Sequence, residues 1–228
     1  MRPRLLSTLL AFLSGYVDTA VFVHMGGLFV AHVTGNFVLL GATVAGAAIG
    51  GAHGGTTVLQ LIAFPVFFLS AMLAPILADR VAAARRTPML LWLAAAITGI
   101  AGALALLLPA ATDAALAMLL VAAMGLLNAA HRMDATLGPP FTVMTGNVTA
   151  VAIAAARQIG LSRAPDPPPA GPASSVMLVL VLAFAAGCAA GAFVQPMLGL
   201  GAMLVPAGLM ALGLAGRGHP GSAAHAKG

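Results

Sequence analysis

The sequence has 228 residues, of which 61% are hydrophobic and 7% are charged, and its net charge is +5. About a quarter of the residues in a soluble domain are charged, so a surface with so little charge must face lipid. The basic residues stand singly or in pairs between apolar stretches, as topology signals do, which argues against a nucleic-acid partner. The only cysteine is Cys188, which excludes an intrachain disulfide and a cysteine metal cluster.

In chain order, the sequence predicts eight apolar segments separated by glycine, proline or charged residues. The first is expected to be a retained span and not a signal peptide, because polar residues interrupt it and no small-residue cleavage site follows. A proline-rich insertion, 165–172, and the tail, 216–228, are expected to be exposed and without regular structure. The predicted apolar segments are 5–23, 37–51, 57–78, 88–108, 114–130, 143–159, 175–195 and 197–215.

The chain carries the same landmarks twice, in the same order. Gly15-Tyr16-Val17-Asp18 is followed by Thr34-Gly35-Asn36, and Gly125-Leu126-Leu127-Asn128 is followed by Thr145-Gly146-Asn147. Ordered landmarks of this kind indicate an internal duplication. Further matched landmarks are Gly26 with Phe29 against Gly138 with Phe141, and residues 71–77 against residues 192–198.

Eight plain crossings fit the charges poorly, because with Arg4 inside, three crossings would place Arg80 outside. If the Thr-Gly-Asn segment of each half enters and leaves on one side, every basic residue lies in the cytoplasm, as the positive-inside rule requires. Three crossings per half also force the halves into opposite orientations. We therefore predict an all-α polytopic membrane protein with two homologous, inverted repeats, six spanning helices and two broken or re-entrant segments. Eight plain spans are the alternative. The predicted single transmembrane domain is 1–215, with repeats 5–108 and 114–215.

Asp18 is the most informative single residue. It follows about a dozen mostly apolar residues, at a depth where a charged aspartate costs about 2.5 to 3.5 kcal/mol and usually faces a partner or a water-filled cavity. Its counterpart in the second half is Asn128, which cannot ionise. This asymmetry predicts a polar pair with one titratable member on the path of a solute or ion. The alternative is an interfacial Asp18 that hydrogen-bonds backbone groups freed at Gly15.

The two Thr-Gly-Asn motifs are typical of a break in the backbone within the membrane. Glycine tolerates the positive φ of a sharp reversal, and threonine or asparagine can cap the helix that follows. Two such helix starts would direct their positive dipole ends at a shared centre, where anionic or polar solutes bind well. Ordinary helix caps at the interface are the alternative. The residues that we place on the path are Asp18, Thr34, Gly35, Asn36, Asn128, Thr145, Gly146 and Asn147.

Several other polar or aromatic side chains lie near these motifs and are secondary candidates. No histidine pair has a firm metal-ligand spacing, so no metal site is predicted. No phosphate loop, dinucleotide motif or serine–histidine arrangement is present, so we predict no cofactor, no catalytic residue and no enzyme activity. The secondary candidates are His24, Phe29, His32, His131, Arg132, Asp134 and Phe141.

These motifs resemble the signatures of the YoaK-like family of bacterial transmembrane proteins, a domain of unknown function. The resemblance implies a multi-pass protein of the bacterial inner membrane, in which the charge pattern predicts a cytoplasmic N-terminus. The matching stretches are 15–18, 26–29 and 32–36 in the first half, and 125–130 and 141–147 in the second.

The sequence favours a small-solute channel or secondary transporter with its path at the repeat interface. A structural or assembly protein without transport activity is the alternative, and an intramembrane enzyme is less favoured. A continuous polar cavity that reaches Asp18 would favour transport, whereas a dry, packed motif would favour the structural role. The expected partners are the lipid bilayer and an unknown small solute or ion, and a homo-oligomer is compatible with the sequence.

Overall fold

The computed structural model of the chain describes residues 3–46, 54–142, 144–161 and 174–216. These residues form helices and loops, and no strand is found among them. The α-helices are α1 (Pro3–His24), α2 (Val33–Val44), α3 (Gly54–Ala78), α4 (Ala83–Leu107), α5 (Asp113–Met133), α6 (Met144–Gln158), α7 (Ser174–Leu198) and α8 (Leu204–Ala215). The 3-10 turns are η1 (Ala110–Thr112), η2 (Ala135–Leu137) and η3 (Gly199–Met203).

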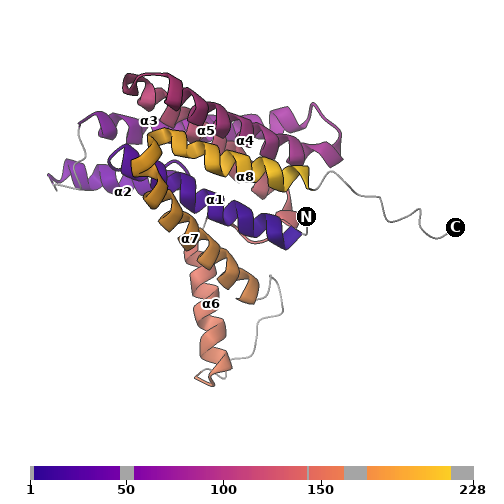
Figure 1. The fold of residues 1–228 in the computed structure, drawn as a ribbon. Coiled ribbons are helices and arrows are strands. Elements are labelled where there is room, and N and C mark those ends of the chain that lie inside the picture. The colour runs from indigo at the N-terminus through magenta and orange to yellow at the C-terminus, as the bar shows by residue number, and fades with distance from the viewer. Residues whose placement is uncertain (1–2, 47–53, 143, 162–173, 217–228) are drawn as a thin grey trace.

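In Figure 1, α1, α3, α4, α5 and α8 form a bundle, and α6 projects away from it along α7. Five described segments are long and apolar enough to cross a membrane: Arg4–His24, Thr57–Ala78, Ala83–Leu107, Ala110–Met133 and Ser174–Ala215, of which the last comprises α7, η3 and α8. The chain is therefore a helical membrane protein, as its composition predicts.

The helices that follow the two broken regions are short. α2 has 12 residues and α6 has 15. At 1.5 Å per residue these helices are about 18 Å and about 22 Å long. A hydrocarbon core is about 30 Å thick, so neither helix reaches across an unthinned bilayer by itself.

Large apolar side chains lie on the outside of the molecule as well as in its centre. Phe68 of α3 is 57% exposed and Phe193 of α7 is 78% exposed, whereas Leu10 and Leu120 are fully buried between the helices. Water would penalise such an outer surface, but lipid does not. The apolar outer faces of α3 and α7 are thus the surfaces that contact the bilayer.

Glycines bring α1 and α7 into close contact. A methyl group at Gly187 of α7 would overlap the carbonyl oxygen of Phe12, and one at Gly191 would overlap that of Tyr16. Gly15 on α1 lies in the same way against the carbonyl oxygen of Phe184. Without a side chain at these positions the two backbones pack directly, as in other small-residue contacts between membrane helices.

The first helices of the two predicted halves run in opposite directions. His24, at the end of α1, contacts Asp113, at the start of α5, and Ser7, near the start of α1, donates a hydrogen bond to the carbonyl of Leu137, just after α5. α1 and α5 are therefore antiparallel. Gly125 of α5 packs against Phe67 of α3, much as Gly15 packs against α7.

The last helices, α4 and α8, are antiparallel as well, and α7 runs parallel to α1. Gly102 of α4 packs against the backbone of Leu204 at the start of α8, whereas Trp92, earlier in α4, lies near Leu214 at its end.

Three of the sequence-based expectations fall outside the described residues. They are the exposed insertion 165–172, the tail from residue 217 onward, and the continuation of the second apolar segment beyond residue 46.

Candidate functional site

The chain reverses at Gly26 and Gly27 in the first half and at Gly138 in the second. Their φ angles are 66°, 120° and 83°, in the left-handed region that favours glycine. The expectation that the glycines of the two Thr-Gly-Asn motifs make the reversal is wrong, because neither has a positive φ. Those two glycines lie inside α2 and α6, after the reversal is complete.

The asparagines of the two motifs hold the preceding loops in place. Asn36 accepts from the backbone N–H of Phe29 and donates to its carbonyl, both at 2.9 Å. In the second half, Asn147 donates to the carbonyl of Pro140 at 2.8 Å. Each asparagine thus reaches back by seven residues, from inside the helix to the loop before it.

The prediction that threonine or asparagine caps α2 is therefore wrong. The N-cap of α2 is His32, whose side chain makes no capping hydrogen bond, and Thr34 and Asn36 lie within the helix. Asn36 instead binds backbone groups of the loop before the helix. A helix cap and this contact meet the same requirement, since both give a hydrogen-bond partner to backbone groups that have none within a helix. The hydrogen bonds of the two asparagines make Pro140 the counterpart of Phe29. The sequence landmarks pair Phe29 with Phe141 instead, so the two alignments differ by one residue.

The structure separates the candidates of each motif by exposure. Asn36 and Asn147 are buried, whereas Thr34, Thr145 and Gly146 are exposed. A methyl group at Gly35 would press on the ring of Phe29, but one at Gly146 would meet open space. Only the asparagines and Gly35 are therefore in contact with the broken regions.

Asp18 lies in the second turn from the end of α1, is only 3% exposed, and binds the loop that leads into α2. The backbone N–H groups of Val30 and Ala31 both donate to its Oδ1 at 2.7 Å. Its Oδ2 lies 2.7 Å from Nδ1 of His32. A buried carboxylate with such partners is stabilised by charge-assisted hydrogen bonds. The unwound backbone is indeed what Asp18 binds, although it lies at 30–31 and not at Gly15.

A continuous chain of hydrogen bonds joins the two halves through this site. Nε2 of His32 lies 2.5 Å from the carbonyl oxygen of Thr142, and the hydroxyl of Thr142 donates to Oδ1 of Asn128 at 2.6 Å. Asp18 and His32 are 14 residues apart, and so are Asn128 and Thr142. The two members of the predicted polar pair do not contact each other directly, because two loop residues stand between them. We call Asp18, His32, Thr142 and Asn128 the polar bridge.

A second polar cluster joins three helices at the C-terminal end of α1. Nε2 of His24 lies 2.7 Å from Oδ2 of Asp113, and its Nδ1 lies 3.0 Å from Nε2 of Gln195 on α7. Sequence reasoning named His24 but missed its partners, which are 89 and 171 residues away. Gln195 lies in the matched landmark 192–198, which was the one available signal.

The remaining secondary candidates lie near the end of α5. His131 lies 2.9 Å from the carbonyl oxygen of Gly138, and its ring packs edge-on against Phe141 at 4.8 Å. Asp134 accepts from the backbone and hydroxyl of Thr136, and Arg132 is exposed. His131 and Asp134 thus support the reversal after α5, as Asp18 and His32 do after α1. Among the described residues no three potential metal-ligating side chains come together.

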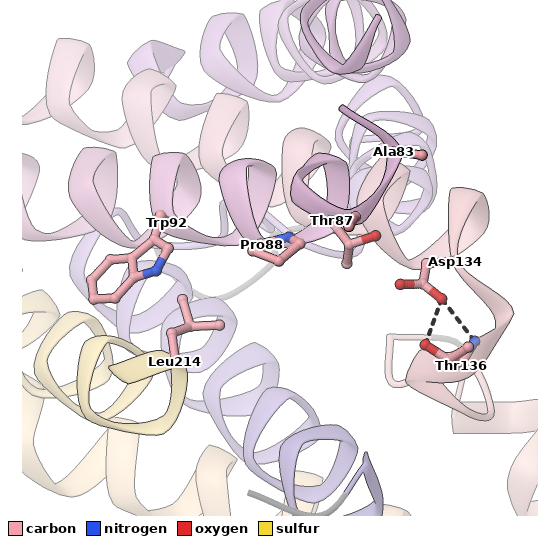
Figure 2. Close-up of a pocket in the computed structure, with 8 residues that line it drawn as sticks. Ala83, Thr87, Pro88, Trp92, Asp134, Thr136 and Leu214 are labelled. Atoms are coloured by element: carbon pink, nitrogen blue, oxygen red, sulfur yellow. Dashed lines mark hydrogen bonds between the residues drawn. The ribbon is translucent and has the colours of Figure 1, made fainter. Parts of the chain in front are cut away.

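One cavity opens beside α4, and it does not reach Asp18. It has a volume of about 390 Å³ and is lined by Trp92, Pro88, Thr87, Asp134, Thr136 and their neighbours. Figure 2 shows Trp92 and Leu214 at one end and the hydrogen-bonded Asp134 and Thr136 at the other. A second, apolar space of about 10 Å³ between α1, α4, α5 and α8 is too small for a solute. Of the residues predicted from the sequence, only Asp134 lines either cavity.

We expect Asn36→Ala to destabilise the fold by about 2 to 4 kcal/mol, because it leaves the partly buried amide and carbonyl of Phe29 without their side-chain partner. Thermal unfolding of the purified protein in detergent measures the effect. Thr34→Ala, two residues earlier on the exposed side, is the matched control and should change stability by less than about 0.5 kcal/mol. Equal effects of the two substitutions would contradict the assigned role of Asn36.

Comparison with known proteins gives one match. The family described as "Protein of unknown function (DUF1275)" matches residues 6–216, which covers both broken regions and all described helices apart from the first residues of α1. No curated protein and no solved structure matches the chain. The match agrees with the YoaK-like resemblance that the motifs indicate, and the chain belongs to the DUF1275 family of proteins of unknown function.

Proposed function

We propose that the protein is a secondary transporter for a small polar solute, with its path at the interface between two inverted halves. It has no enzymatic role in this proposal, it lies in the bacterial inner membrane with a cytoplasmic N-terminus, and it binds no nucleic acid. The observation that carries the proposal is the polar bridge, since it joins the two broken regions at a buried, titratable residue.

The directions of the helices support six crossings and inverted halves. With four crossings in the first half, α1 and α5 would point the same way, but their contacts make them antiparallel. With three crossings in the first half, α1 and α5 point in opposite directions, as their contacts require. In this scheme α2 and α6 are the helices that do not cross the membrane. The same scheme makes α7 parallel to α1 and α4 antiparallel to α8, which are the observed directions.

The positions of the basic residues support a cytoplasmic N-terminus. The contact of Ser7 with Leu137 places the start of α1 beside the end of α5, which carries Arg132. The cavity of Figure 2 joins this end to the start of α4, which carries Arg85 and Arg86. Basic residues gathered at one end of the bundle satisfy the positive-inside rule.

Neither described cavity is lined by a residue of the polar bridge, so neither of them is the path of this proposal. Transporters of inverted-repeat design commonly place their substrate near the midplane, at broken helices of the two repeats. The loop residues 25–32 and 134–142 are the corresponding broken regions here, and they are held by Asp18, Asn36 and His131. Backbone of this kind within a membrane is tolerated when it is enclosed by protein or lines a cavity.

The second candidate is a structural or assembly membrane protein, for which a homo-oligomer in the bilayer is one form. One observation favours it: all three recorded contacts of the Asp18 carboxylate are made within the protein, in a packed site. In that case the polar residues only hold helices together.

A solute-uptake screen with the purified protein in liposomes tests the proposal. We expect saturable uptake of at least one small polar or anionic solute, with a pH dependence that Asp18→Asn removes. Asp79→Asn alters an exposed carboxylate at the end of α3 and is the matched control, which should transport as the wild type does. Full uptake by Asp18→Asn with unchanged pH dependence would contradict a coupling role. No uptake above protein-free liposomes across the panel would favour the structural role.

A further inference from the structure

The hydrogen bonds of His32 define how many protons its ring carries. Nε2 lies 2.5 Å from the carbonyl oxygen of Thr142. A backbone carbonyl only accepts hydrogen bonds, so Nε2 must carry a hydrogen and donate it. The second ring nitrogen, Nδ1, is then free to be either bare or protonated, and its partner decides which.

That partner is the carboxyl of Asp18, and the contact requires one more proton. Nδ1 of His32 and Oδ2 of Asp18 are 2.7 Å apart. A bare Nδ1 opposite a carboxylate would bring two lone pairs together at this distance. Either Nδ1 carries the hydrogen as an imidazolium, or the carboxyl carries it as an acid. Both arrangements hold one proton, and in both the pair has no net charge.

We propose that Asp18 and His32 together form the binding site for one exchangeable proton, that this proton locks the two halves at the polar bridge, and that it is the coupling ion. The last part rests on the proposed function, whereas the first two do not. In this site Asp18 is the enclosed member, with 5% of its side chain exposed. His32 is the accessible member, with 32% of its side chain exposed, so protons reach and leave the pair through its ring.

The surroundings leave the pair without a competing ion pair in the described part of the chain. Tyr16 of α1 donates to the carbonyl of Ala202, and Cys188 of α7 hydrogen-bonds Thr19. His131 of α5 is bound to Gly138. The other titratable groups lie elsewhere: His24 pairs with Asp113, Asp134 contacts Thr136, and Arg157 is in the last turn of α6.

Loss of the proton would separate the halves at this point. A deprotonated pair leaves one hydrogen on the His32 ring, while the Asp18 carboxylate is still held by the amides of the loop. If that hydrogen stays on Nε2, the bare Nδ1 faces the carboxylate, and if it moves to Nδ1, the bare Nε2 faces the Thr142 carbonyl. The ring must then turn or withdraw. Because the same ring makes the contact to Thr142, the link to the second half is lost with it. Opening of the interface is therefore tied to release of one proton, with Asp18 negative and His32 neutral afterwards.

Solid-state NMR of the wild-type protein in lipid, with ¹⁵N-labelled histidine and ¹³C-labelled threonine, tests the proton site without any substitution. The His32 signal is assigned through its proximity to the Thr142 carbonyl. Between pH 5 and pH 9 we expect its ring nitrogen signals to change in one step, and its contact to Thr142 to disappear in the same step. His131 also contacts a backbone carbonyl but has no carboxylate opposite its ring in the described structure, so its signal should not share that step.

Asp18→Asn gives the complementary result. The Asn amide can donate to Nδ1, so we expect His32 to stay neutral, with its hydrogen on Nε2 and its Thr142 contact intact, at every pH in the range. A His32 signal that is constant from pH 5 to pH 9 in the wild type, or that titrates identically in Asp18→Asn, would overturn the proton site.

Proton flux into liposomes, followed with a trapped pH-sensitive dye, separates the two proposals. Solute-dependent flux in the wild type that Asp18→Asn abolishes supports the coupling ion. Titration of His32 as expected, but with neither solute uptake nor proton flux, would overturn the transport function and leave the proton lock standing. Solute uptake without the His32 titration would overturn the proton lock and leave the transport function standing.

Discussion

Leucine in place of Gly187 is expected to prevent α1 and α7 from packing and to leave little folded protein. A side chain at this position would overlap the carbonyl oxygen of Phe12 and approach the backbone nitrogen of Tyr16 to 3.0 Å. Neither atom can move without shifting α1 as a whole, because both belong to its helical backbone. Overpacking against flexible side chains typically costs about 1 to 3 kcal/mol, so a clash with rigid backbone should cost about 3 kcal/mol or more.

The matched control is Gly208→Leu on α8, where a methyl group would meet open space on the exposed face. Fluorescence-detected size-exclusion chromatography of the two variants measures the amount of folded protein. We expect a near-complete loss for Gly187→Leu and a nearly normal yield for Gly208→Leu. A normal, monodisperse yield from Gly187→Leu would mean that the glycine contact between α1 and α7 is not required for folding.

Alanine in place of Asp18 should have the largest effect of any change in the polar bridge. It removes the acceptor of two backbone amides, at Val30 and Ala31, which are themselves 0% and 7% exposed. An unsatisfied buried donor costs about 1 to 3 kcal/mol, and His32 loses its partner as well. We therefore expect a loss of about 3 to 6 kcal/mol, which for a chain of this size lowers the melting temperature by about 6 to 24 °C.

Two substitutions show whether this effect comes from the backbone contacts. Asp18→Asn keeps an acceptor for both amides, so it should cost only about 1 kcal/mol. Asn128→Ala removes the matched residue of the second half. Asn128 accepts from the Thr142 hydroxyl and donates to the carbonyl of Met124 within its own helix, so its loss should destabilise the fold less than Asp18→Ala does. Thermal unfolding in detergent compares all three. If Asp18→Ala and Asn128→Ala unfold at the same temperature, then Asp18 does not hold the loop.

The sequence reveals which residues form the centre of the fold, but not how they contact one another. Asp18 and Asn128 stand out because polar residues deep in apolar segments are expensive, and both lie in the polar bridge. The contact between His32 and Thr142 spans 110 residues and depends on the tertiary packing of the helices. Nothing in the local pattern around either residue indicates it.

The sequence also does not reveal which glycines adopt a left-handed backbone conformation. Gly35 and Gly146 look like the turn residues because they interrupt a polar motif, yet the positive φ angles are at Gly27 and Gly138. Glycine serves for close packing as well as for left-handed backbone, and a sequence does not separate these uses. Gly35 lies against the ring of Phe29, and Gly15 and Gly125 against the backbones of other helices.

The site at Asp18 also shows why composition alone cannot assign transport. A buried carboxylate indicates either a path or a structural contact, and here its recorded contacts are the backbone of an unwound loop and a histidine. What distinguishes this site from a simple structural contact is the histidine, because it carries the link onward to the second half.

The inverted arrangement on which the proposed path depends is tested most directly by cysteine accessibility in intact cells. Single cysteines at Ala82, Leu108 and Met133, all exposed, are placed in a Cys188→Ala background with an epitope tag on the N-terminus. These positions leave every arginine in place, so the topology signals are unchanged. We predict that the tag and the cysteines at 82 and 133 lie in the cytoplasm, and that only the cysteine at 108 reacts with a membrane-impermeant reagent from outside. A cysteine at 82 on the side of the membrane opposite to the tag would contradict three crossings in the first half, and with them the inverted halves.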